Sequence, residues 1–115
     1  MLILHIGMRV KSKIWLEEQS GLIFGSGRAC IVRAVADTGS ISKAAIKLGM
    51  SYRRVWSYIR SAEERLGASL FIKTKGGKGG GGAVLTAFAK DLVIKFEKLD
   101  KEVSSFADQR FKEIF

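Results

Sequence analysis

The sequence predicts a mainly α-helical fold with a small β component. Three observations predict it. Two helix-like segments meet at a tight glycine turn, and a strand, a glycine-rich basic loop and a second strand follow them. The chain then ends in an amphipathic stretch, residues 87–115, without glycine or proline. This order is typical of a winged helix-turn-helix with a long C-terminal helix.

A small β-hairpin is predicted near the start, over about residues 10–24. Apolar runs at 14–16 and 22–24 flank the turn signal Ser20-Gly21, a pattern that favours two short antiparallel strands. The run before it, residues 1–6, is apolar but only one strand long. Because Met8 opens a basic stretch, we expect that the first seven residues are an upstream extension and that Met8 competes with Met1 as the start.

A first helix is predicted over about residues 27–37, with Ser26 as its N-cap. Thr38-Gly39 ends it, since glycine accepts the left-handed conformation after a helix. Its apolar face is expected to comprise Ile31, Val32, Val35 and Ala36. Cys30 is interpreted as a small buried hydrophobic residue rather than a reactive thiol.

Two further helices form the predicted helix-turn-helix, over about residues 41–66. Ser40 can cap a helix that Gly49 ends, and Ser51 can cap a longer helix that Gly67 ends. Small residues stand where the two helices must approach, and glycine stands in the turn, where we expect a side chain to clash. The residues expected to support the packing are Ala44, Ala45, Leu48, Met50, Val55 and Tyr58. A helical hairpin used only for protein contacts shares much of this pattern.

A wing is predicted over about residues 69–86, as strands at 69–73 and 83–86. The connection between them, residues 75–82, holds six of the 13 glycines of the chain. Gly77-Lys78 is not followed by Ser or Thr and no helix starts there, so the loop does not fit a nucleotide-binding P-loop. Its glycines would instead let backbone N–H groups and lysines approach phosphates.

Charge and position together predict a DNA-binding face. The net charge is +9, yet residues 87–115 hold six basic and six acidic residues, so the excess lies in the rest of the chain. Arg28, Lys43 and Lys47 are suited to positioning on phosphates, and arginines in the first turn of the third helix can pair with guanine. The predicted DNA-binding residues are Ser42, Lys43, Ser51, Tyr52, Arg53, Arg54, Trp56, Ser57, Arg60, Lys73, Lys75 and Lys78. For Trp56, packing against the wing is an equal alternative to DNA contact.

The C-terminal helix is predicted from Ala87 onward, with Thr86 as its N-cap. Apolar residues step by three and four along it, as in a coiled-coil seam. At about 1.5 Å per residue it would exceed about 40 Å, longer than the domain can cover. We therefore expect a homodimer; the alternative is a helix folded back on its own domain. The predicted interface comprises Leu92, Phe96, Leu99, Val103 and Phe106. The expected organisation is a DNA-binding domain over 1–86 and a dimerisation helix over 87–115.

Several function classes are disfavoured by composition. With one histidine, His5, and one cysteine, the chain offers no catalytic constellation, no internal disulfide and no metal site. We therefore expect no enzyme activity and no cofactor. The absence of a long apolar run or a basic leader favours a cytoplasmic protein without membrane contact.

Three segments together resemble the N-terminal DNA-binding domain of ModE-type molybdate-responsive transcriptional regulators: GSISKAA at 39–45, GMSYRRVW at 49–56 and GGKGGGGAVLT at 76–86. The resemblance spans nearly the whole chain. It implies a LysR-like winged helix that dimerises through the long helix, binds a palindromic operator in double-stranded DNA and regulates genes of molybdate uptake or molybdenum enzymes.

The resemblance also sets an expectation about sensing. Full members of the family carry C-terminal molybdate-binding domains, whereas this sequence ends after the long helix. We therefore expect no molybdate-binding domain in this chain. Three alternatives are open: a separate molybdate-sensing protein as partner, a different effector, or constitutive operator binding. A winged-helix module for protein interaction, or an accessory partner of a full-length regulator, is the alternative function.

Overall fold

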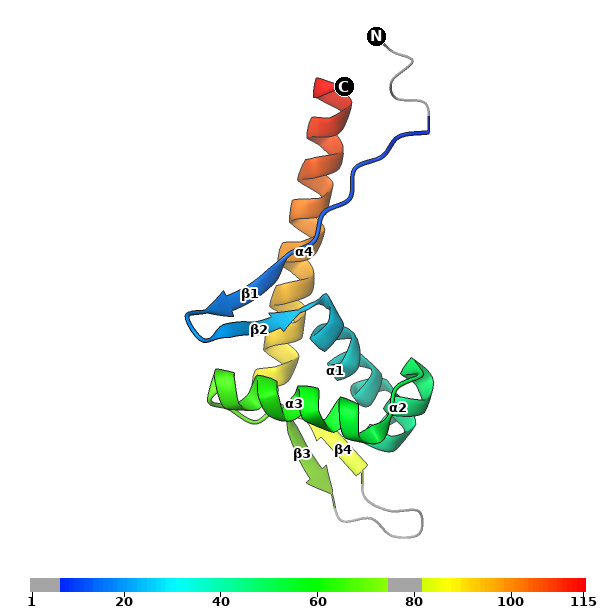
Figure 1. The fold of residues 1–115 in the computed structure, drawn as a ribbon, viewed down its shortest axis with the longest axis vertical. Coiled ribbons are helices and arrows are strands. Elements are labelled where there is room, and N and C mark those ends of the chain that lie inside the picture. The colour runs from blue at the N-terminus through cyan, green and yellow to red at the C-terminus, as the bar shows by residue number, and fades with distance from the viewer. Residues whose placement is uncertain (1–6, 75–81) are drawn as a thin grey trace.

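The computed structural model describes residues 7–74 and 82–115. Along the chain, two strands lead into three helices, a second strand pair follows, and a long helix ends the fold (Figure 1). The elements are β1 (Trp15–Glu18), β2 (Gly21–Gly25), α1 (Ser26–Thr38), α2 (Ile41–Leu48), α3 (Tyr52–Leu66), β3 (Phe71–Thr74), β4 (Gly82–Leu85) and α4 (Ala87–Ile114). The expected order of elements is confirmed. The proposed upstream extension is the first seven residues, of which residues 1–6 lie outside the described residues.

Both strand pairs are antiparallel two-stranded sheets, as the sequence predicts. In the N-terminal hairpin, Trp15 pairs with Gly25 and Glu18 with Gly21, with an irregularity between Leu16 and Glu17. In the wing, strands 71–74 and 82–85 pair without a register shift. The wing therefore projects from the base of the helix-turn-helix as a short ribbon (Figure 1).

Three of the four predicted helix caps are confirmed. The hydroxyls of Ser40, Ser51 and Thr86 each accept a hydrogen bond from the backbone N–H three residues on, at 3.1–3.2 Å. The prediction for Ser26 is wrong, because α1 begins one residue earlier. Its N-cap is Gly25, which has no side chain to accept such a bond.

Glycine ends α1, α2 and α3 through its backbone conformation. At Gly49 the φ angle is +67°, a value that costs an L side chain energy. The expected clash at this turn is not found, since no atom lies within 4 Å of a Cβ built on Gly49. The left-handed backbone therefore explains glycine there.

The core lies on both sides of α1. One side packs against α2 and α3 and buries Val35, Ala44 and Val55 completely. The other side packs against the hairpin, β3 and α4, with Phe24 at its centre. Among the four residues predicted for the apolar face, Ala36 is wrong because it is exposed, and Ala34 is buried instead. The prediction for Cys30 is also wrong, since the thiol-bearing residue is exposed.

Main-chain hydrogen bonds fix the wing to the rest of the fold. The N–H of Ala83 donates to the carbonyl of Gly39 in the α1–α2 turn at 2.9 Å. At the other end of β4, the Thr86 hydroxyl donates to the Ser69 carbonyl at 2.8 Å and its backbone N–H to the Leu70 carbonyl at 3.0 Å. Thr86 thus joins the base of the wing to the start of α4.

The long helix α4 divides into two parts. Its first half packs on the domain, where Phe96 meets Phe24 edge-to-face with 5.4 Å between ring centres. Its second half extends beyond the domain (Figure 1), so the alternative of a helix folded entirely back on its own domain does not hold. None of the described helices combines the length and apolar character needed to cross a bilayer.

Candidate nucleic-acid interface

The first turn of α3 presents exposed polar side chains at a helix N-terminus. Ser51 caps the helix, and Tyr52, Arg53 and Arg54 follow it, all exposed. Among the described residues, the side chain of Arg53 has no hydrogen-bond or ion-pair partner. Because a helix N-terminus favours anions and guanidinium groups bind both phosphates and guanine, this turn is chemically suited to DNA.

The side chain of Arg54 is held by its own helix. Its Nε and Nη2 atoms donate to the Tyr58 hydroxyl at 3.4 and 3.2 Å, and the guanidinium carbon lies 5.7 Å from the centre of the Tyr58 ring. Arg53 and Arg54 are both predicted DNA-binding residues, but their side chains differ in freedom. Arg54 is oriented before it meets a ligand, whereas Arg53 is not.

Trp56 connects α3 to the wing. Its ring packs against the core side that contains Val55, and the Lys73 ammonium lies 4.2 Å from the ring centre. The guanidinium of Arg60 lies 5.6 Å from the same ring. Trp56 thus packs against the wing, one of the two alternatives, and a DNA contact of this residue stays a prediction. The indole contacts two cations, one from α3 and one from β3.

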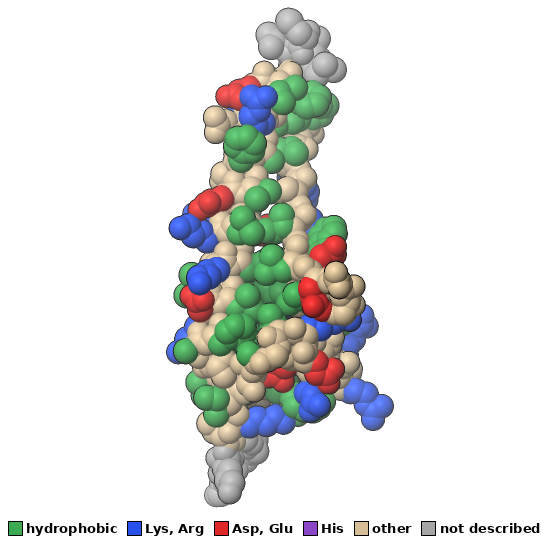
Figure 2. Space-filling model, turned by 90° about the vertical axis from the view of Figure 1, so that its left-hand side faces the viewer, with side chains coloured by type: hydrophobic (Ala, Val, Ile, Leu, Met, Phe, Trp, Pro, Cys, Tyr) green, Lys and Arg blue, Asp and Glu red, His purple; other side chains and the backbone are tan. Residues whose placement is uncertain are grey.

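The remaining predicted residues fall into three places. Ser42 and Lys43 are exposed on α2, and Ser57 is exposed on α3. Arg60 also forms an ion pair with Glu64 at 3.8 Å. Lys75 and Lys78 lie outside the described residues. Lys and Arg side chains fringe the wing end of the molecule in Figure 2.

Tyr58 was not predicted as a positioning group, and the structure adds contacts for Arg28, which was predicted for phosphate positioning. Tyr58 was expected only as a core position, yet its hydroxyl holds Arg54. The guanidinium carbon of Arg28 also lies 5.7 Å from the centre of the Tyr58 ring, and its Nη2 donates to the Ser61 hydroxyl at 3.5 Å. Burial and, to a lesser extent, the nearby charge of Arg65 lower the pKa of Arg28. The contact between Arg54 and Tyr58 could have been predicted from the sequence, because the two residues are four positions apart on one helix.

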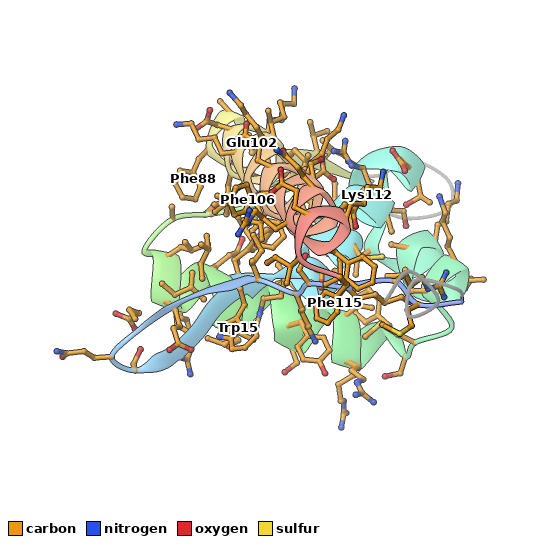
Figure 3. All side chains as sticks on the ribbon, turned by 90° about the horizontal axis from the view of Figure 1, so that it is seen from above. Trp15, Phe88, Glu102, Phe106, Lys112 and Phe115 are labelled. Atoms are coloured by element: carbon orange, nitrogen blue, oxygen red, sulfur yellow. The ribbon has the colours of Figure 1, made fainter. Side chains whose placement is uncertain are left out.

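The residues predicted for a dimer interface fall into two groups, one packed in the domain and one more exposed. Phe96 is buried in its own domain and Leu92 is partly buried there. Farther along α4, Leu99 is 46% exposed and Phe106 is 64% exposed, with Val103 intermediate. Figure 2 shows hydrophobic side chains gathered in a band along the long axis, and Figure 3 shows Phe106 and Lys112 on different sides of α4.

No metal site is found within 7–74 and 82–115: no group of three or more His, Cys, Asp or Glu side chains is placed to hold an ion.

Comparison with known proteins places this geometry in a family. A protein-family model described as "Bacterial regulatory helix-turn-helix protein, lysR family" matches residues 29–90, which include the helix-turn-helix and the wing. The molybdenum-pterin-binding protein MopB of Rhodobacter capsulatus is 34% identical over 87 residues, covering 76% of this chain and 32% of its own length. The DNA-binding transcriptional dual regulator ModE of Escherichia coli K12 is 33% identical over 92 residues, covering 80% and 35%. The chain thus spans about a third of the length of these relatives.

Solved structures share the fold. The structure described as a CbnR_DBD–DNA complex aligns with a TM-score of 0.59 at 19% identity, covering 77% of this chain and 97% of the other. The BenM_DBD/benA site 1 DNA complex aligns with a TM-score of 0.55 at 22% identity, covering 75% and 91%. Because these sequence identities are low, the two comparisons show a shared arrangement of helices and wing and nothing about function.

Proposed function

Because the chain belongs to the lysR family of bacterial regulatory helix-turn-helix proteins, we propose that it binds double-stranded DNA and regulates transcription. The observation that carries the proposal is the exposed, cationic first turn of α3, together with Lys73 of the wing, whose ammonium lies over the ring of Trp56 in the same helix. A helix of this kind enters the major groove with its leading turn, and a wing contacts the adjacent backbone or groove.

The genes under control are proposed to concern molybdate transport or molybdenum enzymes. Relatives at 33–37% identity are named for molybdenum transport, molybdenum-pterin binding or ModE-type regulation. Their similarity covers the helix-turn-helix region of this chain, so it supports a related operator. The family description names regulatory proteins, which supports a non-enzymatic role, and the cytoplasm is where such a protein meets bacterial DNA.

A homodimer is proposed to read a palindromic operator. The exposed apolar residues on the free half of α4, Leu99 and Phe106, would pack on a second copy together with Val103. Phe96 is already covered by its own domain, so we assign it to the core rather than to the interface. A two-fold dimer presents two recognition helices to half-sites related by the same symmetry.

Selection of bound duplexes from a random DNA pool tests this function. We expect an inverted-repeat consensus, with binding that weakens steeply as salt rises, because lysines and arginines displace counterions from phosphates. Repeating the selection with and without molybdate or tungstate shows whether the chain senses an oxyanion. No enrichment and no binding to any duplex at low salt would refute the proposal. A tight protein complex in place of DNA binding would favour an interaction module.

A further inference from the structure

A cavity of about 660 Å³ lies between the N-terminal hairpin, the start of α1 and the helix-turn-helix. Its walls are mostly apolar: Trp15 and Leu22 come from the hairpin, and Leu48 and Met50 from the α2–α3 turn. Trp15 projects from β1 on the side of the molecule where α3 lies (Figure 3). This volume lies within the range of small-molecule sites, which are typically about 300–1,000 Å³. The proposed DNA contacts of α3 do not use it.

The charged groups of the cavity wall all have the same sign. Lys13 and Arg28 line it, and no Asp or Glu among the described residues does. The Nε–H of Arg28 is buried, and within the described chain it has no hydrogen-bond partner. That atom has no surface open to the cavity, so a bound anion would pair with the other nitrogens of the guanidinium, and a charged donor attracts an anion most strongly. Burial also lowers the pKa of Arg28, which indicates that the guanidinium is poorly compensated there.

The start of α1, which forms part of the cavity wall, leaves open space because glycines stand there. Ser26 and Gly27 form the start of α1, whose N-cap Gly25 offers no side-chain acceptor to the first-turn N–H groups. Around Gly27, no atom lies within 4 Å of a built Cβ. A ligand head group near Arg28 would therefore meet donors and open space rather than competing carboxylates.

We propose that this cavity is a binding site for a small organic anion, a carboxylate with an aromatic or branched apolar body. The carboxylate would pair with the Arg28 guanidinium, and the apolar body would lie against Trp15, Leu48 and Met50. A free inorganic oxyanion does not match the apolar walls, because it would leave them dry and unfilled. The site adjoins the proposed DNA-binding surface, because Tyr58, which holds Arg54, also lines the cavity.

Matched probes that differ in charge test this site. Isothermal titration of the full chain, without DNA, compares naphthalene-2-carboxylate with naphthalene-2-carboxamide. We expect the carboxylate to bind about tenfold more tightly, the effect of one charge-assisted hydrogen-bonded pair. Arg28→Met should abolish this preference while keeping the stem of the side chain. Lys112→Met, which removes an exposed charge at the far end of α4 and away from the cavity, is the control and should keep it.

A second variant tests the site by changing the shape of the cavity. Gly27→Leu should narrow the cavity and weaken both probes at least about tenfold, and it should not disrupt α1, since Leu favours helix and the Cβ position is open. Equal affinity for the two probes in the unsubstituted chain would overturn the proposal. So would equal losses in Arg28→Met and Lys112→Met, or undiminished binding in Gly27→Leu.

Discussion

The ammonium of Lys73 lies over the ring of Trp56, 4.2 Å from its centre, so the wing and the third helix are joined by a cation–π contact. Lys73 belongs to β3 and Trp56 to α3. This contact fixes how far a wing lysine stands from the leading turn of α3. The spacing of the two DNA-contacting elements is therefore partly a property of one aromatic side chain.

Replacing Trp56 should weaken DNA binding without unfolding the protein. Trp56→Leu keeps an apolar contact but removes the ring that holds Lys73, and exposed cation–π pairs contribute about 0.5–1 kcal/mol. We expect operator affinity to fall about two- to fivefold in fluorescence anisotropy. Trp56→Phe, which keeps a ring, should fall less. Equal losses in both variants would show that the ring–cation contact does not position the wing.

Arginine substitutions in α3 should separate base reading from general affinity. Arg53→Ala or Arg54→Ala is expected to cost about 1–3 kcal/mol on the selected operator and to relax the sequence preference. Tyr58→Phe removes the hydroxyl that holds Arg54, so it should reproduce part of the Arg54 effect. Lys112→Ala, at the far end of α4, is the charge-matched control. Wild-type operator affinity in all the arginine variants would refute this assignment of the recognition helix.

Lys78→Ala should act on all DNA sequences alike. A lysine that contacts phosphate contributes counterion release, so the slope of log affinity against log salt should flatten by about one unit. Titrations of operator and unrelated duplex at several salt concentrations measure it. A loss confined to the operator would mean that this lysine reads sequence.

A charge on the free half of α4 should disrupt the dimer. Phe106 and Ile94 are 64% and 62% exposed, but only Phe106 belongs to the predicted seam. Phe106→Glu would bury a carboxylate in an apolar contact and should give a monomer in sedimentation equilibrium. Ile94→Glu changes a similarly exposed residue on another side of the helix and should leave the mass unchanged. If both Phe106→Glu and Ile94→Glu remained dimeric, the interface would lie elsewhere.

Thr86 is expected to contribute to stability through two elements at once. Its hydroxyl caps α4 and donates to the Ser69 carbonyl. Thr86→Ala should lower the free energy of unfolding by about 1–2 kcal/mol, measured by urea denaturation. Thr86→Ser retains the hydroxyl and should stay within about 0.5 kcal/mol of the original protein. A similar loss in Thr86→Ser would show that the methyl group, and not the hydrogen bonds, matters.

Local chemistry made much of the fold predictable. Ser40, Ser51 and Thr86 cap their helices because each needs only its own backbone three residues on. Gly49 was placed correctly for an incomplete reason: its φ angle of +67° explains the glycine, while the expected clash is absent. A signal confined to one turn of chain can be read from sequence.

Burial depends on partners that lie far apart in sequence. Cys30 and Ala36 lie on α1 between buried residues, yet both are exposed because α2 and β2 cover other parts of the helix. Phe96 and Phe106 share one apolar stripe, but the domain ends between them, so one is core and the other is surface. Periodicity identified the stripe and could not show where the domain stops covering it.

The bond from the Ala83 N–H to the Gly39 carbonyl uses main-chain atoms only. Side-chain replacement cannot remove it unless proline enters at position 83. The connection over 75–81 could therefore be exchanged for one of another length or composition while the ribbon keeps its attachment. Grafting loops between Thr74 and Gly82 offers a route to regulators with altered groove contacts on an unchanged scaffold.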